Sequence, residues 1–160
     1  MLTATEVRDI LTTAFSTIPL RKGRGLSWHG DFGELNWILQ LDKPPQSLRY
    51  GLILGLDLVE ARGDRPAPSK VNDCPLIIYL ETHRGTPALS RKLIDSTLDL
   101  GSGLGDDERR GNLEVIGQEV AEYLNARLTV SSIADALEAG ELAAAAIMPR
   151  ASAVLAAKVG

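Results

Sequence analysis

Cysteine, aromatic residues and long apolar runs are all scarce in this sequence. Its 160 residues include one cysteine, Cys74, and 4% aromatic residues. One cysteine excludes an internal disulfide and a metal site built on cysteine pairs, and it favours a reducing, cytoplasmic location. The apolar run Leu142–Met148 ends at Pro149, far short of the roughly 20 residues that span a bilayer. Because Met1–Glu6 has neither the basic nor the apolar region of a secretion signal, we expect a soluble protein without one.

Basic charge is not in excess either. The chain has 17 lysines and arginines against 21 aspartates and glutamates, a net charge of −4. A general nucleic-acid or membrane-surface binder needs clustered basic charge to release counterions, so we expect neither partner. The 44% apolar and 24% charged residues are typical of a globular protein. This length predicts a single domain over residues 1–160 whose core needs no disulfide or metal.

Alternation of apolar and polar residues is the strongest pattern present, and it predicts three consecutive strands between residues 26 and 59. A period of two places each apolar set on one face of a strand. Gly33 predicts a hairpin turn after the first strand, since it can take a positive φ. The apolar sets are Leu26, Trp28 and Phe32, then Leu35, Trp37, Leu39 and Leu41, then Tyr50, Leu52, Leu54, Leu56 and Leu58. The predicted register pairs Leu41 with Tyr50, Leu39 with Leu52, Trp37 with Leu54 and Leu35 with Leu56.

Helical patterns flank these strands. Thr3 and Glu6 form a capping box for a helix that runs to Ile18, and residues 61–75 are expected to form a surface loop before a fourth strand at 76–81. Further helices are predicted over 86–98 (capped at Thr86), 112–124 (capped at Asn112), 132–139 (capped by Ser132 and Asp135, ended by Gly140), 141–148 and 151–158.

This order predicts an α+β fold with an N-terminal helix, an antiparallel meander of about four strands, and about three to five C-terminal helices. The fourth strand has two candidate positions, beside the third strand or beside the first.

Several segments in this order resemble a bacterial domain family of unknown function. Pro19–Gly23 is a basic, glycine-ended segment after the first helix, and Leu35–Leu41 carries an asparagine–glutamine pattern in a strand. The glycine-containing run Leu54–Leu56 and the tail Ser132–Leu155, with Gly140 between two helices, are similar too. The resemblance covers most of the chain, although the loop before the fourth strand is longer here. It implies an α+β fold and supplies no activity, cofactor or catalytic residue.

The second face of the predicted sheet carries the candidate binding residues. Glycines within strands mark bulges or close approach by another backbone or ligand, so a shallow polar groove is one interpretation. The alternative is a face that is solvated or covered by other parts of the chain. In the predicted register Gly51 and Gly55 lie opposite Gln40 and Asn36. The candidate residues are Ser27, His29, Asp31, Asn36, Gln40, Gly51, Gly55 and Asp57.

Motifs with catalytic or metal-binding spacing are weak. His29 with Asp31, and Glu81 with His83, each place two ligand types on one side of a strand. In a simple meander these strands lie about 14 Å apart, too far for one metal centre, so no metal or cofactor is predicted. The glycine-rich loop 101–105 follows a helix and precedes acidic residues, which is unlike a phosphate-binding loop.

These observations favour a non-enzymatic cytoplasmic module that binds a protein partner, in an adaptor or immunity-like role. The basic cluster Arg21, Lys22 and Arg24 could meet an acidic partner or be solvated, and the alanine-rich C-terminal helices could form a homodimer surface or pack within the chain. The alternative function is a small hydrolase or metal-dependent enzyme that uses His29, Asp31 and Glu34, assisted by Asp57 or Glu81.

Overall fold

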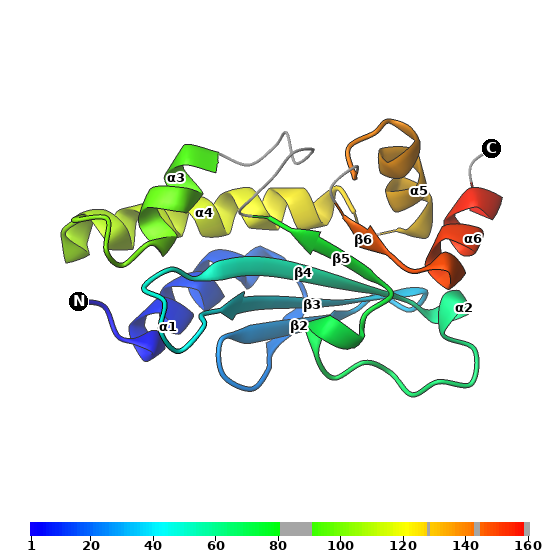
Figure 1. The fold of residues 1–160 in the computed structure, drawn as a ribbon, viewed down its shortest axis with the longest axis horizontal. Helices are drawn as coiled ribbons and strands as arrows, with labels where there is room; N and C mark the ends of the chain where they lie inside the picture. Colours follow the sequence, from blue (N-terminus) through cyan, green and yellow to red (C-terminus); the bar gives the residue numbers. More distant parts are fainter. Residues whose placement is uncertain (81–90, 128, 143–144, 159–160) are drawn as a thin grey trace.

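The computed structural model describes residues 1–80, 91–127, 129–142 and 145–158 of the chain. Over these residues six strands form one antiparallel sheet, in which each strand pairs with the one before it in the chain (Figure 1). The strands are β1 (Leu20–Lys22), β2 (Ser27–Asp31), β3 (Leu35–Asp42), β4 (Gly51–Leu58), β5 (Leu76–Tyr79) and β6 (Ala146–Ile147).

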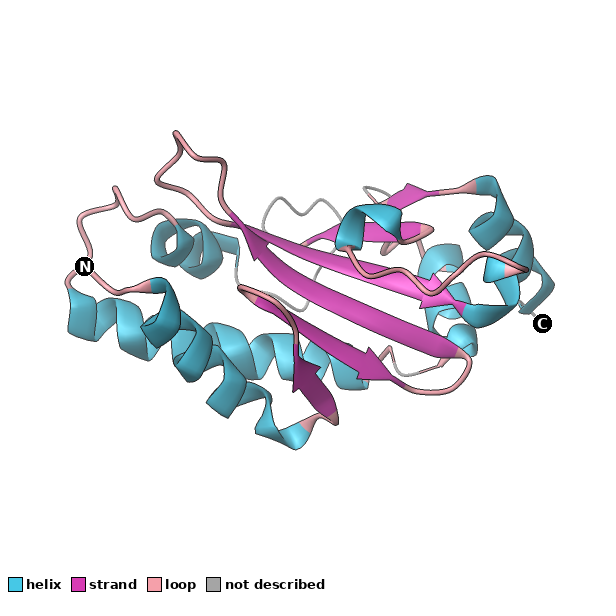
Figure 2. Cartoon of the chain, turned by 90° about the horizontal axis from the view of Figure 1, so that it is seen from below, coloured by secondary structure: helices cyan, strands magenta, loops and turns pink. Residues whose placement is uncertain are grey.

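The helices precede, interrupt and follow this sheet. The longest, α4, and the N-terminal helix α1 run along one side of it (Figure 2). The α-helices are α1 (Ala4–Ala14), α2 (Val59–Arg62), α3 (Arg91–Leu98), α4 (Asp106–Asn125), α5 (Val130–Glu138) and α6 (Pro149–Lys158), and the 3-10 helices are η1 (Phe15–Thr17) and η2 (Val71–Asp73). The predicted α+β class, with an N-terminal helix, an antiparallel meander and C-terminal helices, is confirmed.

Helix α1 begins at the predicted capping box. The Thr3 side chain accepts a hydrogen bond from the Glu6 backbone N–H (3.2 Å), and the Glu6 carboxylate accepts one from the Thr3 backbone N–H (2.7 Å). This exchange satisfies two donors that have no intrahelical acceptor. The predicted end at Ile18 is four residues too late, because the chain tightens into η1 after Ala14.

The predicted register between the two longest strands is wrong by two residues. Leu39 pairs with Leu54 and Leu41 with Leu52, and β4 begins at Gly51. A slip of two keeps every side chain on its predicted face, since side chains alternate with a period of two. The preceding segment pairs elsewhere: Arg49 forms a bridge with Asp99, at the end of α3.

The sequence analysis predicted neither of the two edge strands of the sheet, β1 and β6. Residues 20–22, part of the basic segment Pro19–Gly23 for which no strand was predicted, form β1 and pair with β2. Residues 146–147, expected to be helical, form β6 against β5, because pairing with the open edge of β5 overrides the helix propensity of alanine. The fourth predicted strand, β5, lies beside β4, which is one of the two positions left open.

Three helix starts were also predicted too late, one of them that of α6, which begins at Pro149 rather than at residue 151. Helix α4 begins at Asp106, and the predicted cap Asn112 lies inside it. The three acidic residues of its first turn interact favourably with the positive end of the helix dipole. Helix α5 begins at Val130, and Thr129 rather than Ser132 accepts the capping hydrogen bond (3.0 Å). The predicted cap at Thr86 lies outside the described residues.

The end of α5 at Gly140 is as predicted. Gly140 has φ 79°, and its N–H donates to the Leu137 carbonyl (3.1 Å) while the Glu141 N–H donates to the Ala136 carbonyl (3.0 Å). These two bonds form the Schellman arrangement, which needs a residue with positive φ. The chain then turns back, and α6 packs beside α5 with Ala151 and Leu155 buried. Dimerisation through these helices stays a prediction.

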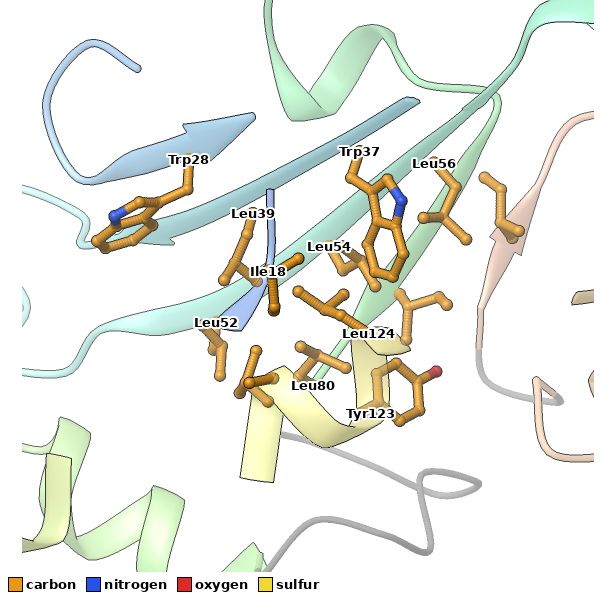
Figure 3. Packing of buried hydrophobic residues seen from close by; sticks show 14 of the residues in the cluster. Ile18, Trp28, Trp37, Leu39, Leu52, Leu54, Leu56, Leu80, Tyr123 and Leu124 are labelled. Carbon is orange, nitrogen blue, oxygen red and sulfur yellow. The ribbon is translucent and has the colours of Figure 1, made fainter. Parts of the chain in front are cut away.

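The main core lies between one sheet face and helices α1 and α4. Trp37 and Leu54 project from the sheet toward Tyr123 and Leu124 of α4 (Figure 3). On the α1 side, the ring of Trp28 packs edge-on against another aromatic ring of the core, and its Nε1 donates to Thr12 Oγ1 (2.9 Å). The apolar alternation therefore marks the core face correctly.

Helices α1 and α4 approach closely at a glycine. A Cβ atom at Gly117 would lie 2.4 Å from the Cβ of Ala14, a separation that two carbon atoms do not tolerate. Gly117 thus lets the backbones of the two helices come together, which a side chain at this position would prevent.

Candidate functional site

The centre of the second sheet face is apolar and covered. The loop after α2 crosses it, and a Cβ at Gly55 would lie 2.6 Å from Cys74 Sγ and 3.3 Å from the Cα of Val71. Ile38 packs there with Val71 and Cys74 in a second, small apolar cluster. The glycine within the strand therefore makes room for the chain's own loop.

The polar residues of this face are consequently separated. Gly55 pairs with Ile38 and Gly51 with Asp42, so the predicted placement of these glycines opposite Asn36 and Gln40 is wrong, as follows from the two-residue shift in register. The sequence carried a signal that was missed, because Ile38, Ile53 and Ile77 share the parity of the polar residues. Two hollows remain, one on each side of the covering loop.

The first, which we call the histidine hollow, has a volume of about 480 Å³. It brings together three of the predicted site residues from β2 and β3. Two basic side chains and a serine from the flanking loops add to its polar lining, and Gly25, Leu26 and Leu41 line it as well. The polar residues are Ser27, His29 and Gln40, with Arg24, Ser69 and Lys70.

His29 is half-buried in this hollow. Burial lowers the pKa of His29 below its ordinary value, and the positive charge of Arg21 on the neighbouring strand lowers it further. His29 is therefore neutral at pH 7, since an ordinary histidine pKa is already near 6.5. Gly23 lies against the ring: a Cβ there would come within 2.5 Å of His29 Nε2. The positive charge of the hollow thus comes from its arginine and lysine residues.

The second, which we call the arginine hollow, has a volume of about 280 Å³. It lies beside the end of β4 and the start of α6. Its polar lining residues are Asp57, Arg62, Arg65, Ser69, Asp73 and Arg150.

Asp57 is the buried anchor of the arginine hollow. It is 2% exposed and forms an ion pair with Arg62, and this hydrogen-bonded partner raises the pKa of Arg62. With its amide oriented to satisfy both ends, Asn36 donates to Asp31 Oδ1 (2.8 Å) and accepts from Arg62 Nη2 (3.1 Å). The structure therefore joins Asp31, Asn36 and Asp57 through Arg62, a residue that the sequence analysis did not select.

The three residues of the alternative enzymatic function, His29, Asp31 and Glu34, form no hydrogen bonds with one another in the structure. The Asp31 carboxylate accepts from the Gly33 backbone N–H in the hairpin turn (3.0 Å), and the Glu34 carboxylate accepts from the Val130 N–H at the start of α5 (3.2 Å). Among the described residues, no carboxylate hydrogen-bonds His29, and no three histidine, cysteine or acidic side chains are grouped to hold a metal. Glu81 and His83 lie outside the described part of the chain.

Cys74 belongs to the covering loop, and its thiol lies against Gly55 of the sheet. It is 1% exposed, and burial, together with the charges of Asp57 and Asp73, raises the pKa of its thiol to about 12. A thiol that stays protonated and shielded at neutral pH is a poor nucleophile.

We therefore predict that Cys74 resists alkylation in the folded protein. Iodoacetamide at about pH 8, near the ordinary thiol pKa, should leave the native protein unmodified and modify it rapidly in guanidinium chloride. Mass spectrometry of both samples measures the result. Modification at equal rates with and without denaturant would contradict the burial of this thiol.

Comparisons with protein-family models, with curated proteins and with solved structures found no match to this chain. The resemblance to a bacterial family of unknown function stays a prediction. Over the described residues, none of the helices combines the length and the apolar character needed to cross a bilayer. The geometry of the two hollows is thus the basis for a functional proposal.

Proposed function

We propose that this protein is a non-enzymatic cytoplasmic binding module that takes an acidic protein segment at its second sheet face, in an adaptor or immunity-like role. The observation that carries the proposal is the group of basic side chains around the histidine hollow. Arg21, Arg24 and Lys70 come from β1 and two loops far apart in the chain, and all three are exposed.

These three basic side chains have no acidic partner among the described residues. None of the three forms an ion pair with the described residues, whereas Arg49, Arg62 and other basic residues do. In a chain with net charge −4, a local group of unpaired cations marks a surface where an acidic partner is attracted and wrong partners are repelled.

The number of basic side chains around the histidine hollow indicates the class of partner. Three basic side chains are too few to bind a nucleic acid or a membrane surface without sequence or lipid preference, since the chain as a whole is acidic. They suit a short acidic peptide segment whose carboxylates reach the rim while its backbone meets the amide group of Gln40 within the hollow. The single cysteine, Cys74, supports a reducing compartment.

The test is fluorescence anisotropy with a labelled oligoglutamate peptide and the double variant Arg24→Glu/Lys70→Glu. We expect the wild type to bind and the variant to bind at least about tenfold more weakly, because two attractive contacts become repulsive. Binding should also weaken as salt is added.

The matched control is Lys92→Glu/Lys158→Glu, which changes the net charge equally at exposed positions on α3 and α6. We expect it to bind like the wild type. Equal weakening in both variants would reveal a dependence on net charge alone, and absence of binding by the wild type would overturn the proposal.

A further inference from the structure

We infer that the arginine hollow is a binding site for the phosphate group of a small molecule. This inference does not rest on the proposed protein partner, because the two hollows share only Ser69 and none of their charged residues. The hollow, at about 280 Å³, suits a small group rather than a peptide segment.

Two guanidinium groups of the hollow have no acceptor. Arg65 is exposed, Arg150 is half-buried, and neither side chain forms a hydrogen bond or an ion pair with the described residues. The Nε atom of Arg150 is buried without a partner. A buried donor left unsatisfied is costly, and a ligand oxygen in the hollow would supply the missing acceptor.

The start of α6 adds a second source of positive potential. Pro149 and Arg150 are the first two residues of this helix. Pro149 has no N–H, and the N–H groups of Ala151 and Ser152 donate to the Met148 carbonyl. This leaves the Arg150 N–H as the one free backbone donor at this end among the described residues. The positive end of the helix dipole therefore lies beside the unpaired guanidinium of Arg150, a combination that favours an anion.

The net positive charge of the residues that line the hollow also favours binding of an anion. Three arginines and two aspartates line the hollow, and Asp57 is buried and paired with Arg62. The exposed Asp73 and the remaining Arg65 and Arg150 also line it without pairing with one another, so the lining carries one positive charge in excess. Guanidinium groups that approach from separate elements suit a tetrahedral group with several acceptor oxygens, whereas a planar carboxylate is satisfied by a single arginine.

The wall of the hollow is restrained before any ligand arrives. The loop segment 65–69 contains Pro66 and Pro68, and both line the hollow. Proline fixes the backbone φ angle, so little conformational freedom is lost on binding. On its inner side the Asp57 carboxylate holds Arg62 in place.

Isothermal titration calorimetry of the full chain with inorganic phosphate, glucose 6-phosphate and acetate at matched ionic strength tests the inference. We expect saturable binding of the phosphate probes, with Kd on the order of 1 mM or tighter, and none of acetate. Equal affinity for inorganic phosphate and glucose 6-phosphate would mean that the protein binds the phosphate group alone. Tighter binding of glucose 6-phosphate would mean that the sugar contributes to the affinity. Acetate binding as tightly as phosphate would overturn the inference.

The variants are Arg150→Gln and Arg65→Gln, each expected to weaken phosphate binding by about tenfold or more. Arg24→Gln, which removes the same charge from the histidine hollow, is expected to leave it unchanged. Arg65 is exposed, so its variant folds even where the change at Arg150 disturbs α6. Unchanged affinity in both hollow variants would overturn the inference. Oligoglutamate binding measured on Arg150→Gln separates the two proposals, because only the histidine hollow should govern it.

Discussion

Arg62→Ala is expected to lower the free energy of unfolding by about 3 kcal/mol at pH 7, as measured by urea denaturation. The substitution leaves the Asp57 carboxylate, whose side chain is 3% exposed, without its cation. A buried carboxylate without a partner is far more costly than an exposed one. The opposite change, Asp57→Asn, should cost less, because the Arg62 side chain is 20% exposed and can turn toward water.

A matched control for this prediction is Arg65→Ala. Arg65 lines the same hollow but is exposed and unpaired among the described residues, so its replacement should change the free energy of unfolding by no more than about 0.5 kcal/mol. An equal loss in both variants would mean that the hollow as a whole, rather than the buried ion pair, contributes the stability.

The second large effect is expected for Gly117→Leu, which should lower the free energy of unfolding by about 3 kcal/mol. Its Cβ would lie 2.4 Å from the Cβ of Ala14, and neither atom can move without its backbone. Helices α1 and α4 must then separate, which opens the core around Leu11 and Phe15. Thermal and urea denaturation measure the loss.

Gly111→Leu on the same helix should have the opposite sign. A Cβ at Gly111 meets nothing within 4 Å, so the variant gains the helix propensity of leucine over glycine, about 0.5 to 1 kcal/mol. Similar effects at the two positions would mean that glycine acts through helix propensity alone and that the approach of α1 to α4 does not constrain Gly117.

The strands and their inward faces could be predicted because the signal is local. Trp37, Leu39 and Leu54 belong to runs of large apolar residues at every second position of their strands, and burial of one face requires that pattern. The register depends on long-range pairing instead. Arg49 bridges Asp99 rather than β3, and nothing near residue 49 indicates a partner that far along the chain. Local patterns also misassigned β6, since Ala146 favours helix until the edge of β5 offers it hydrogen bonds.

The candidate site was predicted in part for the same reason. Strand parity placed Asn36 and Asp57 on one face, and the structure pairs them directly. Arg62 and Arg150 could not be selected, because the short helix α2 and the start of α6, which follow no periodic pattern in the sequence, bring them to that face. The covering of Gly55 was indicated by the isoleucines that share its face, Ile38, Ile53 and Ile77. The prediction followed the apolar set of the other face and did not take them into account.

The packing of α1 against α4 has a consequence for how the chain folds during synthesis. The strand pairs from β1 to β5 join neighbouring segments, which close quickly. Glu6 of α1 and Arg110 of α4 form an ion pair 104 positions apart, so α1 cannot complete its packing until α4 has been made. Over that interval the apolar face of the meander lacks its main cover, and the nascent chain is then most open to aggregation and to capture by chaperones.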